Sequence, residues 1–289
     1  MSLFSSNDDI EHPVNGVPFS SPAAPLLART DHDRPSVFRP ENLLREARRQ
    51  KGLGAGRVPR VSVLDPDGDI VQHVCDQHGA RRSDAWACYH TQLWEWQADG
   101  VTYGVVGSAV GASFAVLIAE QLFASGCEVL ISIASAGQIT PAAPPPYTIL
   151  VERALRDEGT SYHYLPASTY ADGDAALLAL AEDAFRAAGC QVLRGATWTT
   201  DAPFRETAET IAERRAAGIL AVEMEAAALY AFAAARGVPV LCLAHVSNQL
   251  GCIEGDFEKG DANGACGAIA LLKAFAATWA RAQPKERVA

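Results

Sequence analysis

From residue 61 onward, short apolar runs alternate with helical patterns, and this alternation constrains the fold more than any other feature of the sequence. Val61–Leu64, Glu128–Ile133 and Val238–Ala244 have the length and composition of strands. Ala112–Ala124 and Ala265–Ala280 have apolar residues at helical spacing. Strands that alternate with helices are typical of proteins in which helices pack on a sheet. We therefore predict an α/β layered fold.

The remaining pattern fits one domain that is preceded by an extension. The first 58 residues have scattered Pro, Ser, Asn and Asp and one helical segment, so we predict an N-terminal extension over residues 1–58 and a single α/β domain over 59–289. A flexible arm is the alternative for the extension. Further strands are predicted at 91–96, 101–106, 148–151, 191–197 and 219–222, and further helices at 41–50, 175–188 and 224–236.

Composition excludes several classes of protein. The formal net charge is -10, and no basic run offsets it, so we expect no nucleic-acid partner. No apolar stretch is long enough to span a membrane and the first thirty residues lack a secretory pattern, so we expect a cytoplasmic protein without a membrane partner. The seven cysteines include no C-x-x-C pair, so we expect neither a disulfide framework nor a metal site.

Two carboxylates lie where a predicted strand passes into a predicted helix. Glu223 and Glu225 flank Met224 in an otherwise apolar run. Ligands of open α/β sheets bind at the carboxyl ends of strands, and a carboxylate there can accept hydrogen bonds from both hydroxyls of a vicinal diol. The alternative is that both glutamates only begin the helix and interact with its dipole.

Three aspartates follow the first strand of the domain. Asp65, Asp67 and Asp69 alternate with Pro66 and Gly68. Asp, Pro and Gly are ordinary turn residues, so a tight turn without any chemical role is an equal alternative for each aspartate taken singly. We expect at least one of them to face a pocket.

These motifs resemble a known family. Val222-Glu-Met-Glu225, followed by small residues, resembles the signature shared by uridine phosphorylases, purine nucleoside phosphorylases and methylthioadenosine nucleosidases. Ile133-Ala-Ser135-Ala-Gly137 is similar to the strand end that faces the sugar in that family, and residues 198–207 occupy the place of its nucleobase pocket. The resemblance covers roughly residues 60 to 280. It implies a three-layer sandwich with a mixed, twisted central sheet.

The resemblance also implies roles for individual residues. Glu223, Met224, Glu225 and Ser135 would hold the ribose. Phe204 would stack on the base, with Arg205 and Asp201 beside it, although Asp201 could instead cap a helix. Asn248 stands where purine-cleaving relatives have an aspartate that protonates the base. Because an amide donates and accepts hydrogen bonds, Asn248 favours an oxo-base such as hypoxanthine or uracil.

The chain departs from the family where phosphate would bind. Leu64 replaces a glycine of the family's first loop, and aspartates stand where an arginine is expected. Ser132 and the pair Tyr89-His90 stand where two further arginines are expected. The loop instead aligns Asp69 with the glutamate that activates water in the nucleosidases. Arg45, Arg48 and Arg49 of the predicted helix in the extension are candidates for a replacement, from the arm or a partner subunit.

We therefore interpret the chain as an enzyme that cleaves the N-glycosidic bond of a nucleoside, with Asp69 as general base and water slightly favoured over phosphate as the nucleophile. We expect no cofactor, with phosphate as a possible co-substrate, and a homo-oligomer, a dimer or hexamer. Two alternatives remain open. One is a nucleoside-binding protein without chemistry, and the other is a nucleotide N-glycosidase.

Overall fold

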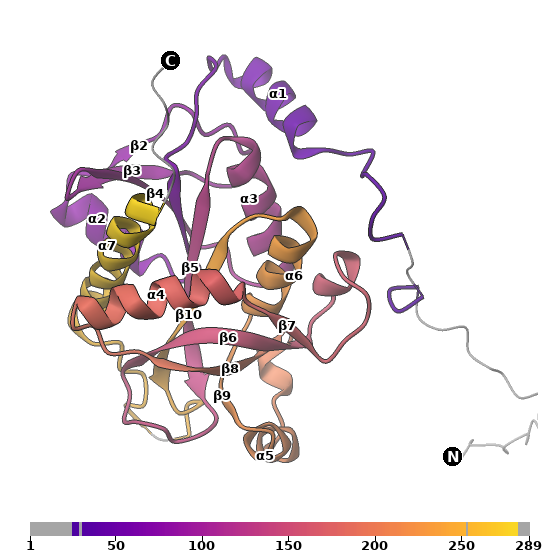
Figure 1. Cartoon of the computed structure of the whole chain (residues 1–289), viewed down its shortest axis with the longest axis vertical. Helices are drawn as coiled ribbons and strands as arrows, with labels where there is room; N and C mark the ends of the chain where they lie inside the picture. Colours follow the sequence, from indigo (N-terminus) through magenta and orange to yellow (C-terminus); the bar gives the residue numbers. More distant parts are fainter. Residues whose placement is uncertain (1–24, 29–30, 253, 283–289) are drawn as a thin grey trace, which may run out of the picture.

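The computed structural model describes residues 25–28, 31–252 and 254–282. Within these residues one mixed sheet forms the centre, and helices cover both of its faces (Figure 1). This arrangement confirms the predicted α/β fold with a mixed, twisted sheet between helical layers. Among the described residues, no helix is long and apolar enough to cross a membrane.

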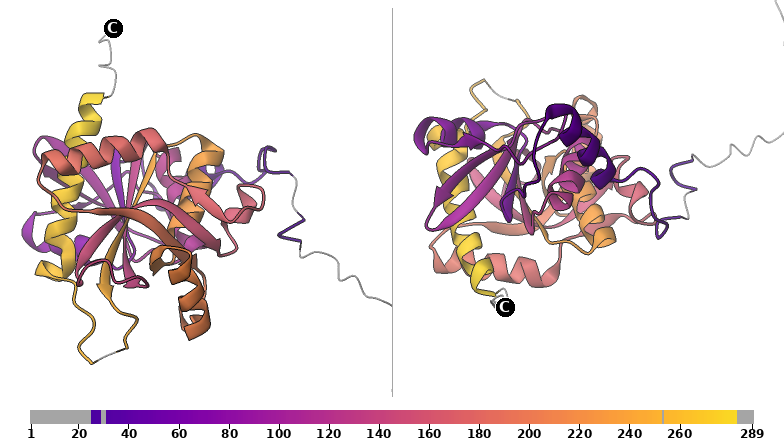
Figure 2. Two further views of the ribbon diagram at one scale, coloured as in Figure 1. Left: turned by 60° about the horizontal axis from the view of Figure 1, so that its bottom comes forward. Right: turned by 90° about the horizontal axis from the view of Figure 1, so that it is seen from above.

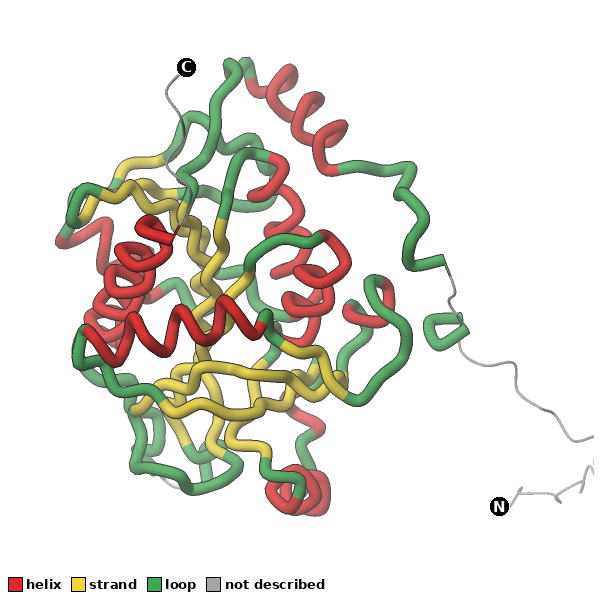
Figure 3. Tube along the Cα trace, viewed as in Figure 1, coloured by secondary structure: helices red, strands yellow, loops and turns green. Residues whose placement is uncertain are grey.

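The sheet combines a closed ring of strands with an open extension. Strands β5, β10, β6, β8 and β9 pair in a cycle that returns to β5, and β1, β4, β3 and β2 continue outward from β5. Figure 3 shows the strands crossing the centre of the molecule. The strands are β1 (Val61–Asp65), β2 (Arg81–Arg82), β3 (Trp94–Ala98), β4 (Val101–Gly107), β5 (Val129–Gln138), β6 (Tyr147–Asp157), β7 (Tyr170–Asp172), β8 (Leu193–Thr200), β9 (Ile219–Glu223) and β10 (Val240–Asn248).

The helices form two layers, which are visible from two directions in Figure 2. Helix α7 contacts α2 and α4 on one side, and α3 contacts α1 and α6 on the other. Helix α5 packs against β9 and buries none of its residues. The helices are α1 (Pro40–Lys51), α2 (Asp69–Gln77), α3 (Ala112–Ala124), α4 (Ala175–Ala187), α5 (Ala208–Ala216), α6 (Ala226–Arg236) and α7 (Ala265–Ala282).

Neighbouring residues of the central strands supply two separate hydrophobic cores. In β5, Val129 and Ile131 pack with α2, α4 and α7, whereas Leu130 packs with α3 and α6. Successive side chains of a strand point to opposite faces, so a continuously apolar strand can fill both cores. This explains why the apolar runs in the sequence correctly predicted buried strands.

Some predicted boundaries were wrong. The helix predicted from Met224 begins only at Ala226, because Glu225 has φ -131 and is the N-cap. The strand predicted at 91–96 is observed at Trp94–Ala98. Helix α2 begins directly after the first aspartate turn, at Asp69, and was not predicted. Helix α5 was missed because a helix without buried residues leaves little apolar periodicity.

The helix predicted in the extension is present as α1 and packs on the domain of its own chain. Leu44 and Ala47 are buried there. Arg48 donates to the carbonyl of Ala85 at 2.7 Å, while Arg45 and Arg49 pair with Glu46. The three arginines therefore contact local groups in this chain. The division at residue 58 stays a prediction.

Candidate functional site

The predicted sugar-binding residues come from the ends of β5 and β9, and Asn248, predicted to bind the base, comes from the end of β10. Gly137 of β5 lies opposite Val222 of β9 and opposite Asn248 of β10 in the registers of the sheet. A β-carbon at Gly137 would lie 3.3 Å from Oδ1 of Asn248 and would meet the end of the Leu250 side chain, which would have to move, so the strands approach closely here. The close approach brings the ends of β5, β9 and β10 to one edge, as expected for a ligand site of an α/β sheet.

Glu223 is the structural carboxylate of this edge. Its Oε1 accepts hydrogen bonds from the hydroxyls of Thr197 at 3.1 Å and Thr199 at 2.5 Å. Its Oε2 accepts from the backbone N–H groups of Glu225 and Ala226, each at 2.7 Å. Burial raises the pKa of Glu223, and these donors partly offset the rise. Because its two oxygens together accept four hydrogen bonds, the geometry favours a role in fixing the start of α6 over direct contact with a ligand.

Glu225 is differently placed. It is 3% exposed and accepts only two hydrogen bonds among the described residues, at Oε1 from the backbone N–H of Gly111 at 2.6 Å and at Oε2 from the backbone N–H of Met224 at 3.3 Å. Gly111 is the residue before α3 and has φ 90, a conformation that favours glycine. Burial, together with the charges of Glu223 and Asp67, raises the pKa of Glu225 to about 8. At neutral pH this side chain is therefore largely a neutral acid, which can both donate and accept a hydrogen bond.

Ser135 and Asp67 meet across the site. The hydroxyl of Ser135, from the end of β5, donates to Oδ2 of Asp67 in the loop after β1. Asp67 also lies close enough to Glu225 to contribute to its raised pKa. The side chain of Met224, between the two glutamates, is partly exposed. Ser135, Glu225 and Asp67 are thus brought together, although 158 positions (225 minus 67) separate the last two.

Asp69 lies beside a lysine that the sequence did not indicate. Oδ2 of Asp69 lies 2.6 Å from Nζ of Lys259, and Oδ1 accepts from Nδ2 of Asn263 at 3.3 Å. The same Nζ lies 3.2 Å from Oδ2 of Asp67. Lys259 belongs to the loop after β10, where a lone lysine among polar residues gives no motif to detect.

Asp65 is the buried aspartate of the turn between β1 and α2. It is 2% exposed, and its Oδ2 accepts from the backbone N–H of Val71 at 2.9 Å. Burial raises the pKa of Asp65 to about 7, with smaller contributions from the charges of Asp67 and Asp69. Asp65 therefore holds the start of α2 in place, while Asp67 and Asp69 remain partly exposed.

The residues predicted to bind the base do not converge in the same way. Asn248 is buried and uses its Oδ1 to accept from the N–H of Leu250 at 3.0 Å. Phe204 is 100% exposed, and Arg205 beside it is also exposed. Asp201 accepts from the N–H of Gly159 at 2.8 Å and does not cap a helix. Asn248 lies at the end of β10 and Asp201 directly follows β8, but of these four residues only Asn248 is buried.

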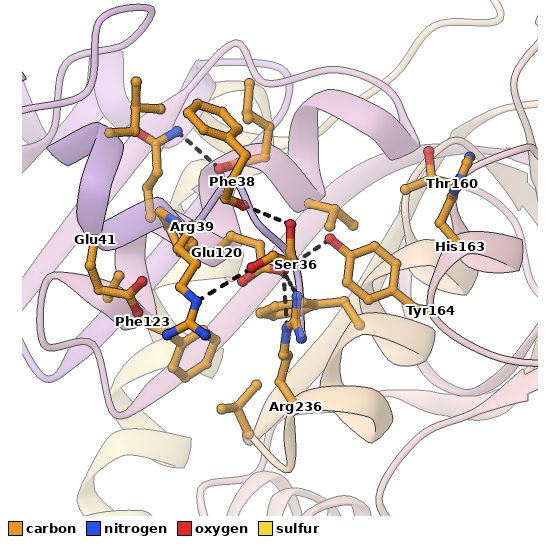
Figure 4. A pocket seen from close by; sticks show the side chains of 18 of the residues that line it. Ser36, Phe38, Arg39, Glu41, Glu120, Phe123, Thr160, His163, Tyr164 and Arg236 are labelled. Carbon is orange, nitrogen blue, oxygen red and sulfur yellow. Dashed lines mark hydrogen bonds and ion pairs between the residues drawn. The ribbon is translucent and has the colours of Figure 1, made fainter. Parts of the chain in front are cut away.

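A separate cavity of about 810 Å³ lies between the arm that leads into α1 and helices α3 and α6. Figure 4 shows Arg39, Phe123 and Tyr164 around it, with Glu120 joined to Arg236. None of the residues predicted to bind sugar or base lines this cavity. It is therefore distinct from the candidate site.

Comparisons with known proteins identify the family of this chain. The family model described as the phosphorylase superfamily matches residues 65–280. Purine nucleoside phosphorylases of the DeoD type from Bacillus cereus, Bacillus thuringiensis and Bacillus mycoides are similar to this chain. Each is 29% identical over 153 residues, which are 52% of this chain and 65% of the relative. The chain thus spans slightly less than two thirds of the length of these relatives.

Proposed function

This chain belongs to the phosphorylase superfamily, and we propose that it is an enzyme that binds a nucleoside and cleaves its N-glycosidic bond. One observation carries the proposal. Glu225 is a buried acid at a strand end and lies near Asp67, which in turn accepts a hydrogen bond from Ser135, so that a polar ligand there would meet several hydrogen-bonding groups at once. Such convergence of polar groups, one with a perturbed pKa, is characteristic of active sites.

The sugar is assigned to the groups around Glu225. Glu225 would bind the ribose hydroxyls, Met224 would pack on the ring, and Ser135 would contact the ribose or the attacking group. Glu223 would support them from within the core, since its hydrogen bonds fix the backbone of Glu225. Holding the sugar rigidly lowers the entropic cost of reaching the transition state.

Water is the proposed nucleophile. The first loop presents Asp67 and Asp69 beside a single lysine, so the charges of these three groups sum to a net negative value. A phosphate dianion would be repelled there, whereas water can be held and deprotonated by a carboxylate. Asp69, or its neighbour Asp67, is the proposed general base for attack on an oxocarbenium-like sugar.

The base side of the proposal rests on Asn248, with Phe204, Arg205 and Asp201 as further candidates. An amide suits a base with an oxo group beside a ring N–H, so hypoxanthine and uracil nucleosides are the proposed substrates. Because Phe204 is fully exposed in the single chain, we propose that a second copy of the chain covers it in a homo-oligomer. Cytoplasmic location and the division of the chain at residue 58 are part of the same proposal.

The test is to incubate inosine and uridine with the full-length protein, with and without phosphate, and to identify the sugar product. We expect free ribose at equal rates in both conditions. Strict dependence on phosphate with formation of ribose 1-phosphate would overturn the choice of water. A preference for the nucleoside 5′-monophosphate would indicate a nucleotide N-glycosidase, and tight binding without base release would indicate a binding protein.

A further inference from the structure

We propose that Lys259 is a positioning residue that orients Asp67, and that Asp67 rather than Asp69 is the group that takes the proton from the attacking water. This inference rests on the proposed function and deepens it. It starts from one contact, in which Nζ of Lys259 lies 3.2 Å from Oδ2 of Asp67 and 2.6 Å from Oδ2 of Asp69. The first loop and the loop after β10 are thereby joined at the edge of the site.

The free oxygen atoms distinguish the two aspartates. Both oxygens of Asp69 are occupied, one by Lys259 and one by Nδ2 of Asn263. Asp67 uses only Oδ2, which contacts Ser135 and Lys259, and its Oδ1 has no hydrogen-bond partner within the described part of the chain. A proton acceptor needs an accessible lone pair, and Asp67 has one.

Asp67 is also the aspartate that faces the sugar residues. Ser135 donates to it, and its charge contributes to the raised pKa of Glu225. No such contact to Ser135 or effect on Glu225 is found for Asp69 among the residues that the structure describes. Asp69 instead begins α2 and anchors the lysine there.

The backbone holds Lys259 in this place. Nε2 of His245, in β10, donates to the carbonyl of Lys259 at 2.9 Å, and the N–H of Glu258 donates to the carbonyl of Ser247 at 2.8 Å. Asp256 accepts from the N–H groups of Gln249 and Gly251, each at 2.8 Å, at the start of the same loop. Lys259 is thus fixed relative to β10 on both sides, as a positioning residue requires.

The ammonium group has a clear electrostatic role. Burial alone lowers the pKa of Lys259, but hydrogen bonds to Asp69 and Asp67 and their charges outweigh burial and raise it above its usual value. The lysine therefore stays charged and stabilises the negative charge of Asp67. The other titratable groups around Asp67 are Asp65 and Asp69 on its own loop, Glu225 before α6 and His245 behind Lys259.

The proposed step balances as follows. Water transfers a proton to Oδ1 of Asp67, and its oxygen forms a bond to the anomeric carbon. The bond from that carbon to the base nitrogen breaks, and its electron pair leaves with the base. The base takes a proton from solvent, because Asn248 cannot act as an acid, and Asp67 returns its own proton to solvent.

The experiment compares four substitutions by the pH dependence of kcat and by KM. We expect Lys259→Met to move the acidic limb of the kcat profile upward by about one pH unit, which lowers kcat about tenfold at pH values below the wild-type midpoint, with KM changed less than about threefold. Lys259→Arg should keep the acidic limb near its wild-type position and retain most of the wild-type kcat. Asn263→Ala, which loosens Asp69 alone, should leave the acidic limb in place. Lys273→Met is the matched control, because Lys273 pairs with Asp99 in the turn between β3 and β4.

A second readout does not need turnover. The carboxyl carbon of Asp67 is titrated by NMR in the wild type and in Lys259→Met, with Asp67→Asn to assign the signal and circular dichroism to verify folding. We expect a higher titration midpoint in the variant. If the wild type releases no base from any nucleoside, the proposed function fails while this titration still decides the role of Lys259. An unchanged midpoint, or an acidic limb that moves with Asn263→Ala, overturns the inference.

Discussion

Glu223 and Glu225 are held by the core of the protein, whereas Asp67, Asp69 and Lys259 are held by one another at its edge. The glutamates are 4% and 3% exposed and bond to backbone N–H groups and threonine hydroxyls. The side chains of Asp67 and Lys259 are 32% and 27% exposed. Buried hydrogen bonds resist rearrangement, but exposed ion pairs contribute little to stability. The core side is thus suited to fix a sugar, and the edge side is suited to exchange protons and water.

The largest effect that tests this contrast is expected for Glu225→Gln. The amide keeps the size of the side chain but can no longer become a carboxylate that accepts from two ribose hydroxyls. Hydrogen bonds to a charged group contribute about 1.5 to 3 kcal/mol each, so kcat/KM should fall by about two to four orders of magnitude. Steady-state release of base from inosine or uridine measures kcat/KM. A loss below threefold would remove Glu225 from the sugar site.

The sequence could predict the core side because its signals are local. Glu223 and Glu225 are two charges within an apolar run, and such charges need partners. The alternation of strands and helices likewise follows from short segments, each readable by itself. Closure of the five-stranded ring could not be predicted, because the pairing of β10 with both β5 and β6 depends on contacts between distant segments.

The contacts of the edge side could not be predicted from the sequence, because they too join distant segments. Lys259 lies 190 positions from Asp69, and nothing near either residue indicates that they meet. The turn Asp65–Asp69 was recognised, but the choice among its three aspartates depends on which oxygens other residues occupy. Only the structure shows that Asp65 is buried and that Asp67 contacts Ser135.

A second test compares stability. Glu223→Ala leaves two backbone N–H groups and the hydroxyls of Thr197 and Thr199 without their acceptor in the core, so we expect the free energy of unfolding to fall by about 3 to 5 kcal/mol. Asp69→Asn removes only a partly exposed ion pair and should cost less than about 1 kcal/mol. Urea unfolding followed by circular dichroism gives both values. Equal losses would contradict the division into a core side and an edge side.

The last test concerns pH. The pKa of Glu225 is raised to about 8 in the folded protein, well above its ordinary value of 4.5. Between these two values the unfolded chain ionises while the folded chain retains the proton. The folded state therefore binds more protons, and its stability is greatest below about pH 4.5 and is lost as the pH rises towards 8.

For this one group, the loss is at most about 1.4 kcal/mol per pH unit. Glu225→Gln should remove it, so that urea unfolding at pH 5, 6, 7 and 8 gives a flatter dependence for the variant than for the wild type. Asp65→Asn should remove a further part of the pH dependence of stability, because burial also raises the pKa of Asp65, to about 7. Parallel curves for Glu225→Gln and the wild type would mean that Glu225 is already ionised in the folded protein. Its carboxylate would then be ready for the ribose hydroxyls without loss of a proton, and nucleoside affinity would not rise between pH 6 and 8.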